Sequence, residues 1–343
     1  MSENILLSTP QTPLLSVDDV KKWYPVRQSM FASLIQPDKR FVKAIDGVSI
    51  QLKKQEIIGL VGESGSGKST LGELVTLLQT PTEGTITFDG ADISSLHGDA
   101  LKQFRKRVQV IFQDPYATLN QRFTIYRTVV EPLIIHGVRD KGERTRRVKL
   151  ALTRSGLKPE DDLLNAYPHN LSGGQRQRVS IARAIVLEPD LVVADEPVSM
   201  LDVSVRSGIL NLLAELRDTI GLTIIFISHD LSTVQNLCDR IAVMYLGRIV
   251  EIGPVKQVIE RAFHPYTRAL LEAVPLVDPD VKRERTNIDS EPPSAIDLPP
   301  GCRFSSRCPF VTPECLIAEP ELVEMAPGHY VRCIHPRHEP IWY

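Results

Sequence analysis

The fold of this chain is decided by nine residues, Gly62-Glu63-Ser64-Gly65-Ser66-Gly67-Lys68-Ser69-Thr70. They match the pattern G-x-x-x-x-G-K-[ST] and follow the apolar run Ile57–Val61, which has the length of a strand. Glycines let consecutive backbone N–H groups curl around one anion, and a following helix turns its positive end to the same point. In this pattern Lys68 reaches the β- and γ-phosphates of a nucleotide and Ser69 binds Mg²⁺. The strand before the loop and the helix after it argue against a chance match.

A second acidic element lies downstream, where the run Leu191–Ala194 ends in Asp195 and Glu196. An acid at the end of a strand can hold the shell of a Mg²⁺ ion, which suits Asp195. Glu196 then faces the γ-phosphate, where a carboxylate can orient or deprotonate the attacking water. Two acids after a strand usually only begin a solvated loop. Together with the upstream loop, however, they predict nucleotide hydrolysis.

Around these two elements, β-rich runs alternate with helical patterns from Leu14 to about Ile259, which predicts an α/β fold with a mostly parallel sheet. A helix is expected at about Val205–Thr219, with Gly221 as its stop. Residues 125–170 lack strand signals and predict a helical insertion. Around 277–300 the composition shifts to proline and charged residues, as in a linker. The other expected strands are Val108–Phe112, Leu191–Ala194, Thr223–Ile227 and Ile241–Tyr245.

The composition excludes several classes of protein. Among 343 residues, 40 Lys and Arg balance 42 Asp and Glu, and the net charge of −2 does not predict nucleic acid as a partner. No apolar run approaches the length of a membrane-spanning helix. The start of the chain has neither the basic residues nor the apolar core of a signal peptide. We therefore expect the chain to stay in the cytoplasm and to reach a membrane only through a partner.

Between the two nucleotide elements lies Leu171-Ser172-Gly173-Gly174-Gln175, which resembles the LSGGQ signature of ABC ATPases. A glycine pair that opens a helix exposes backbone N–H groups to an anion, and Ser172 adds a donor. An ordinary capped helix would explain Ser172 but not the whole string.

Other landmarks of the ABC ATPases follow in order, and the resemblance gives each a role. Gln113 matches the glutamine that senses Mg²⁺ and faces the permease. Asp202 matches the aspartate of the D-loop, although Met200 replaces the usual Ala before it. His229 matches the switch histidine that contacts the γ-phosphate. A lone histidine after a strand is more often structural, so its role depends on the ordered set.

The aromatic side chain that stacks on adenine is expected to be Tyr24, with Trp23 as the alternative. Within the ABC ATPases the chain resembles the subunits of oligopeptide and dipeptide importers (the peptide/nickel group), particularly the second of their two paired ATPases. Ser66 in place of a frequent Cys, and Gln121-Arg122 in place of Pro-Arg, are small departures. The supporting strings are Gln113–Tyr116, Glu131–Leu133, His264–Leu271 and Pro299–Cys302.

The resemblance covers nearly the whole chain and implies its architecture. We expect a RecA-like phosphate-loop core with N-terminal antiparallel strands, an inserted helical subdomain and a small Cys-rich C-terminal extension. The boundaries would be a tail at 1–13, a nucleotide-binding domain at 14–260 with its helical subdomain at about 116–185, and an extension at 261–343.

The resemblance also implies a motor that hydrolyses ATP with Mg²⁺ to import peptides or a similar small solute. The signature Leu171–Gln175 would act in trans on the ATP site of another subunit, which we expect to be a sister ATPase rather than an identical chain. Two permease subunits and an extracytoplasmic substrate-binding protein would complete an importer, with this chain peripheral on the cytoplasmic face of the cell membrane. A soluble ABC ATPase without a permease is the alternative, although such proteins usually carry two nucleotide units or a long coiled coil.

Four cysteines lie close to the end of the chain, in the pattern Cys302-x5-Cys308-x6-Cys315-x17-Cys333. In a reducing cytosol, disulfides are the less expected use for them. The spacing indicates a metal without selecting one, because it has neither the close pair of structural zinc nor a ferredoxin run. The family resemblance favours a four-iron, four-sulfur cluster over zinc or bare thiols. His335 and His338 are alternative ligands, and Cys238 is expected in the core.

Overall fold

The computed structural model describes residues 12–26, 40–273, 293–296 and 298–338. Most of the expected tail at 1–13 and much of the expected linker around 277–300 lie outside the described residues. Among the described residues, no helix is both long and apolar enough to span a bilayer.

An eight-stranded sheet forms the centre of the fold, in the order β11-β12-β10-β9-β3-β8-β7-β6. The five strands from β9 to β6 are parallel, and β10, β12 and β11 extend the sheet by antiparallel pairing. All five strands expected from apolar runs are present, with ends within one residue, because parallel strands are buried on both faces. The strands are β3 (Ile57–Val61), β6 (Val108–Ile111), β7 (Leu191–Asp195), β8 (Thr223–Ser228), β9 (Arg240–Tyr245), β10 (Arg248–Pro254), β11 (Val323–Ala326) and β12 (His329–Val331).

A second, antiparallel sheet of four strands comes mainly from the N-terminal part of the chain, as the family resemblance implied. Its order is β2-β1-β4-β5. Apolar residues of β1 and β2 form one buried cluster with those of β3 and of the helix after it. The phosphate loop therefore lies between the two sheets. The strands are β1 (Leu15–Pro25), β2 (Phe41–Leu52), β4 (Glu83–Phe88) and β5 (Ala91–Asp92).

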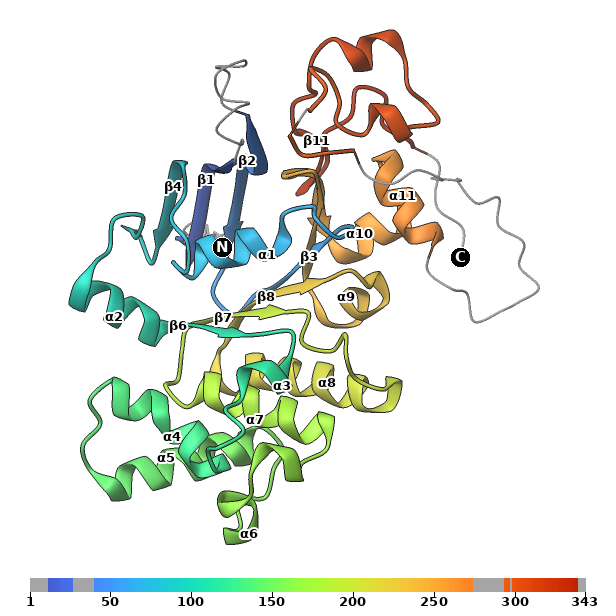
Figure 1. Ribbon diagram of the computed structural model, residues 1–343. Helices are drawn as coiled ribbons and strands as arrows, with labels where there is room; N and C mark the ends of the chain where they lie inside the picture. Colours follow the sequence, from blue (N-terminus) through green and yellow to red (C-terminus); the bar gives the residue numbers. More distant parts are fainter. Residues whose placement is uncertain (1–11, 27–39, 274–292, 297, 339–343) are drawn as a thin grey trace, which may run out of the picture.

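Helices cover the parallel strands, and most of them gather at the end of the molecule away from the antiparallel sheet (Figure 1). The stretch 125–170 is helical, as expected, and α8 runs slightly beyond its predicted ends. Gly221 ends α8 at φ 69°, a left-handed conformation that suits glycine. The helices are α1 (Lys68–Val75), α2 (Gly98–Arg107), α3 (Pro115–Thr118), α4 (Ile125–Ile135), α5 (Lys141–Arg154), α6 (Asp161–Asn165), α7 (Gly173–Ile185), α8 (Val203–Ile220), α9 (Leu231–Leu237), α10 (Val255–Glu260) and α11 (Pro265–Glu272).

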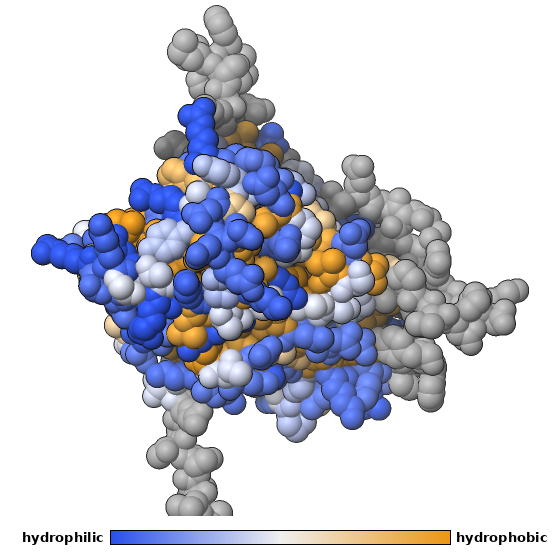
Figure 2. Space-filling model, turned by 90° about the horizontal axis from the view of Figure 1, so that it is seen from below, coloured by the Kyte–Doolittle hydropathy of each residue, from blue (hydrophilic) through white to orange (hydrophobic). Residues whose placement is uncertain are grey.

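Figure 2 looks at the molecule from the side of these helices. Hydrophilic side chains cover most of this face, and separate apolar patches lie between them. The polar surface fits helices that bury one apolar stripe each and turn the rest to solvent.

The C-terminal segment, residues 298–338, adds β11 and β12 to the central sheet. Strand β12 pairs with β10, with Glu251 opposite Val331. The fully buried Glu251 carboxylate accepts hydrogen bonds from the Phe263 and His264 N–H groups at 2.7 and 3.0 Å and lies 2.8 Å from His329 Nε2. One carboxylate thus joins β10, the start of α11 and β12.

Candidate functional site

The loop Gly62–Gly67 joins β3 to α1, and two of its glycines occupy positions that no other residue fits. Gly67 has φ 106°, and a Cβ there would lie 2.4 Å from Ala44 O. Gly62 has φ 151°, and its Cβ would lie 2.2 Å from Met244 O. Both contacts are with backbone, which cannot swing away. The glycines of the motif are therefore required by close approach as well as by conformation.

Lys68, the first residue of α1, points back into this loop. Its ammonium donates to Gly62 O at 2.8 Å and to Glu63 O at 2.9 Å. Burial lowers the pKa of Lys68, and the carboxylates of Glu196, Asp195 and Glu63 oppose that shift. A buried cation is thus held beside the loop N–H groups, where phosphate oxygens would bind.

Ser69 and Asp195 meet at the end of the parallel strands. The Ser69 hydroxyl donates to Asp195 Oδ1 at 3.2 Å. Burial raises the pKa of the Asp195 carboxyl, and the charge of Glu196 adds to that shift, while the Ser69 hydrogen bond and Lys68 oppose it. A hydroxyl and a partly desolvated carboxylate are oxygen ligands of the kind that Mg²⁺ prefers.

Glu196 is the centre of a three-residue group. Gln113 Nε2 donates to Glu196 Oε2 at 3.0 Å, and His229 Nδ1 lies 3.1 Å from Glu196 Oε1. Glu196 has φ 44°, a strained backbone for a residue other than glycine, and its N–H donates to Ile227 O at 3.0 Å. The three residues follow β6, β7 and β8, whose carboxyl ends meet at one edge of the sheet. The geometry fits a carboxylate aimed at a water beside the γ-phosphate.

The two adenine candidates are consecutive in β1 and point to opposite faces. The Tyr24 hydroxyl donates to Gln79 Oε1 at 2.9 Å and also interacts with Thr70 on α1. The Trp23 indole N–H donates to Asp46 Oδ1 at 2.9 Å, and the Lys43 ammonium lies 5.1 Å from the centre of its ring. Tyr24 is therefore the aromatic that lies beside the phosphate-loop helix.

The signature residues open α7. Ser172 is the N-cap, and Ser172 and Gln175 bond reciprocally through side chain and backbone. A Cβ on Gly173 would lie 3.7 Å from Leu201, next to Asp202, which is itself the N-cap of α8. Within the described part of the chain, no hydrogen bond joins Leu171–Gln175 to the phosphate loop. The signature thus lies beside the start of α8 and makes no hydrogen bond to the phosphate loop among the described residues.

The four C-terminal cysteines are all reduced and line one cavity, together with apolar residues such as Phe304 and Ile334. Burial raises the pKa of the Cys302 thiol to about 11 and that of Cys333 to about 12, and it also raises the pKa of Cys308. Yet no three His, Cys, Asp or Glu side chains among the described residues converge as ligands of one ion. Tetrahedral zinc would hold its sulfurs about 3.8 Å apart, from a Zn–S distance of about 2.3 Å. The four thiols thus share a cavity, but the described residues do not form a ligand set for a single metal ion.

His335 also lines this cavity, where its Nε2 lies 3.0 Å from Thr312 Oγ1 and 3.4 Å from Glu314. His338 packs edge-on against Phe263. Cys238 is a buried core residue under β3, as expected, with its sulfur 3.2 Å from the position of a Cβ on Gly59.

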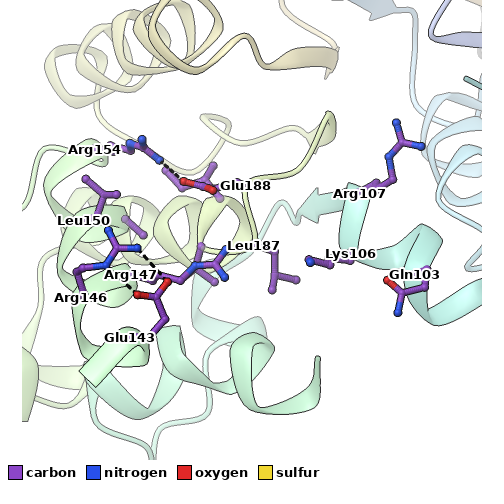
Figure 3. A pocket seen from close by; sticks show the side chains of 13 residues that line it. Gln103, Lys106, Arg107, Glu143, Arg146, Arg147, Leu150, Arg154, Leu187 and Glu188 are labelled. Atoms are coloured by element: carbon purple, nitrogen blue, oxygen red, sulfur yellow. Dashed lines mark hydrogen bonds and ion pairs between the residues drawn. The ribbon is translucent and has the colours of Figure 1, made fainter. Parts of the chain in front are cut away.

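One large cavity among the described residues lies away from the nucleotide motifs. It has a volume of about 560 Å³ and lies between α2, α5 and the end of α7. Figure 3 shows Arg154 paired with Glu188 and Arg146 with Glu143, at 3.0 and 2.8 Å. We name it the basic cleft, since its charged lining is Lys106, Arg107, Arg146, Arg147, Arg154, Glu143 and Glu188.

A second groove lies next to Gln113. Its volume is about 320 Å³, and it runs between the end of β6 and α4. Phe112, Leu78 and Ile135, with exposed fractions of 37, 49 and 57%, are apolar side chains of its lining. Exposed apolar side chains gathered in a groove indicate a protein contact. We name it the apolar groove.

Two side chains outside the motifs contact Glu63 of the phosphate loop. Arg307 pairs with Glu63 across 244 positions of sequence, and Tyr266 accepts the Glu63 N–H across 203 positions. Sequence reasoning missed both, because no local pattern marks an arginine or a tyrosine as the partner of a residue so far away.

The chain is similar to known proteins over most of its length. The family model described as ABC transporter matches residues 45–199, and the model described as oligopeptide/dipeptide transporter, C-terminal region, matches residues 250–315. The oligopeptide transport ATP-binding protein AppF of Bacillus subtilis is 46% identical over 94% of this chain and 97% of its own. The dipeptide transport ATP-binding protein DppF of Escherichia coli is 45% identical over 95% of each chain.

Solved structures show the same fold. A dimeric ATP-binding cassette in a post-hydrolysis state, bound to ADP and Pi, matches with a TM-score of 0.61 and 29% identity over 70% of this chain and 98% of its own. CbiO1 of Clostridium perfringens, part of an ABC transporter complex, matches with a TM-score of 0.61 and 30% identity over 72% of this chain and 90% of its own.

Proposed function

Because this chain belongs to the ABC transporter family as an ATP-hydrolysing subunit, with the C-terminal region of oligopeptide/dipeptide transporters, we propose that it drives the import of peptides or a similar small solute. The observation that carries this proposal is the Glu196 carboxylate, held between Gln113 and His229 beside a complete phosphate loop. Relatives that align over nearly their whole length are named for peptide transport.

The residues divide the reaction between them. The loop Gly62–Thr70 binds the phosphates, and Lys68 supplies the cation that faces the β- and γ-phosphates. Ser69, Asp195 and Gln113 would hold Mg²⁺, which neutralises charge that builds up on the phosphates. Glu196 orients and deprotonates the attacking water, and His229 contacts the γ-phosphate. Tyr24 stacks on adenine.

A second ATPase completes the site. The signature residues Leu171–Gln175 make no hydrogen bond to the loop of their own chain, and solved relatives of this fold are dimeric. We place the signature in trans, with Asp202 beside the same subunit boundary. A sister ATPase is the favoured partner, because the chain resembles one member of a pair.

The contact with the membrane proteins lies at the apolar groove. Phe112 of that groove directly precedes Gln113, so a permease segment seated there reaches the nucleotide through one residue. Two permease subunits and an extracytoplasmic substrate-binding protein complete the importer. This chain then lies peripherally on the cytoplasmic face of the membrane.

The nucleotide-binding domain is assigned to residues 14–260, its helical subdomain to about 116–185, and the C-terminal extension to 261–343. In that extension, Cys302, Cys308, Cys315 and Cys333 would hold a four-iron, four-sulfur cluster, which supports local structure. Their shared cavity and apolar surroundings favour this group. Iron and acid-labile sulfide in an anaerobic preparation test it. An iron-free anaerobic protein would rule it out.

ATPase activity of the co-expressed assembly, compared with that of the isolated chain, tests the proposed function. We expect strong activity only where permease subunits and a second ATPase are present, because those proteins complete the site and the groove. Full activity of the lone chain, with no permease in the preparation, would instead indicate a soluble ATPase without a transport role.

A further inference from the structure

The phosphate loop is held from outside by the C-terminal segment. The Arg307 guanidinium forms two parallel hydrogen bonds with the Glu63 carboxylate, Nη1 to Oε2 at 2.8 Å and Nη2 to Oε1 at 3.0 Å. The Arg307 side chain is only 5% exposed. The Glu63 side chain is 28% exposed, so the pair is partly buried, and its two-pronged geometry fixes the orientation as well as the distance of its partner.

A second contact holds the same residue by its backbone. The Glu63 N–H donates to the Tyr266 hydroxyl at 2.8 Å. Tyr266 is fully buried on α11 and packs against Tyr245 and Phe304, with ring centres 4.7 and 5.4 Å away. Arg307 thus binds the side chain of Glu63, and Tyr266 binds its backbone. The Glu63 N–H points away from the phosphate site.

These two contacts restrict a loop that would otherwise be flexible. Glycines at positions 62, 65 and 67 give it the curvature that phosphates require, but they also leave it many other conformations. A loop that is already held in its binding conformation loses less entropy when the nucleotide arrives. The sequence motif allows any residue at the position of Glu63. The contacts of Glu63 with Arg307 and Tyr266 are therefore a feature of this fold and not of the motif.

We propose that Arg307 is a positioning residue of the ATP site, which holds the phosphate loop in its binding conformation through Glu63. The C-terminal segment therefore contributes to nucleotide binding. This inference rests on the proposed binding of ATP to Gly62–Thr70.

Arg307 lies in the chain between two of the four cysteines. Arg307 ends a single 3-10 turn, Ser305–Arg307, which lies between Cys302 and Cys308. The Ser305 N–H donates to Cys302 O at 3.0 Å, and both cysteines line the same cavity. Arg303, next to Cys302, also binds the buried Asp46 carboxylate of β2. Arg307 thus joins the cysteine-bearing segment to the phosphate loop, and Arg303 joins the same segment to β2.

Replacement of the arginine in the full chain tests the proposal. We expect Arg307→Ala to raise the ATP dissociation constant about tenfold, the effect of one partly buried hydrogen-bonded charge pair. In the assembled ATPase, KM should rise more than kcat falls, and hydrogen exchange at the loop amides should become faster. Arg307→Lys, which keeps the charge but loses the two-pronged geometry, should be intermediate.

Arg332→Ala is the matched control. Arg332 lies in the same segment and donates to Ile249 O and Pro320 O, so its loss loosens the segment without touching the loop. If Arg332→Ala weakens ATP binding as much as Arg307→Ala, general loosening explains the effect and the proposal fails.

A double-mutant cycle measures the contribution of the contact between Arg307 and Glu63 itself. Glu63→Gln should weaken ATP binding in the wild-type background and change it little once Arg307 is alanine, because both changes break the same contact. Fully additive effects would overturn the proposal. A wild-type chain that binds no ATP would instead contradict the proposed function.

Discussion

At the scale of single residues, the adjacent acidic residues Asp195 and Glu196 lie in different environments. Burial raises the pKa of Asp195, which contacts Ser69, whereas Glu196 accepts from Gln113 and lies beside His229. The positive φ of Glu196 turns it away from the strand direction that Asp195 follows. One acid is therefore placed for a cation and the other for water.

Glu196→Gln is predicted to abolish hydrolysis while ATP binding persists. The amide keeps the size of the side chain and its contact with Gln113 but cannot take a proton, and the loss of general-base catalysis costs about 10²–10⁴-fold in rate. Phosphate release by the assembled ATPase and nucleotide binding by the full chain are the two measurements. Glu215→Gln, at an exposed position of α8, is the control and should retain activity. Wild-type turnover in Glu196→Gln would remove Glu196 from the role of base.

At the scale of elements, the sequence predicts what is locally encoded. Strands β3, β7 and β8 each contain a run of apolar residues, and α8 has its apolar stripe and its stop at Gly221. Each of these elements is therefore recognisable without its neighbours. The motif likewise places Lys68 and Ser69, because their spacing from the strand fixes their position.

The attachment of the C-terminal segment could not be predicted in this way. Strand β12 is three residues long, and its pairing with β10 depends on the buried Glu251 rather than on a pattern. Likewise, the contact between Arg307 and Glu63 forms only when folding brings two distant segments together. Both are set by tertiary packing, which residue periodicity does not encode.

Glu251→Ala is predicted to destabilise the fold by about 3–5 kcal/mol, because it leaves several buried polar groups without their partner at about 1–3 kcal/mol each. The change leaves the N–H groups of Phe263 and His264 and the ring of His329 without their common acceptor. Urea unfolding measures the difference. Glu260→Ala is the matched control, since Glu260 is exposed and only faces Lys256 at 3.9 Å. Equal midpoints for the two variants would contradict the role of Glu251.

At the scale of the whole molecule, the nucleotide residues divide into two groups. Lys68, Asp195, Glu196 and His229 gather at the carboxyl edge of the parallel strands, whereas the signature opens α7 in the helical layer (Figure 1). This division fits the proposed arrangement, in which a second ATPase supplies the signature and ATP binds at the boundary between subunits.

Ser172→Arg is predicted to leave ATP binding by the isolated chain unchanged and to lower hydrolysis by the assembled ATPase about 100-fold, the cost of losing a donor to the reacting phosphate. A signature that acts in trans contributes nothing to the phosphate loop of its own chain. Ser172 is also the N-cap of α7, so its loss weakens that helix. As a control for this effect, Thr124→Arg removes the equivalent N-cap of α4. That control should retain both activities. If Ser172→Arg instead weakens ATP binding by the isolated chain as Lys68→Ala does, the signature acts in cis and each chain holds a complete site by itself.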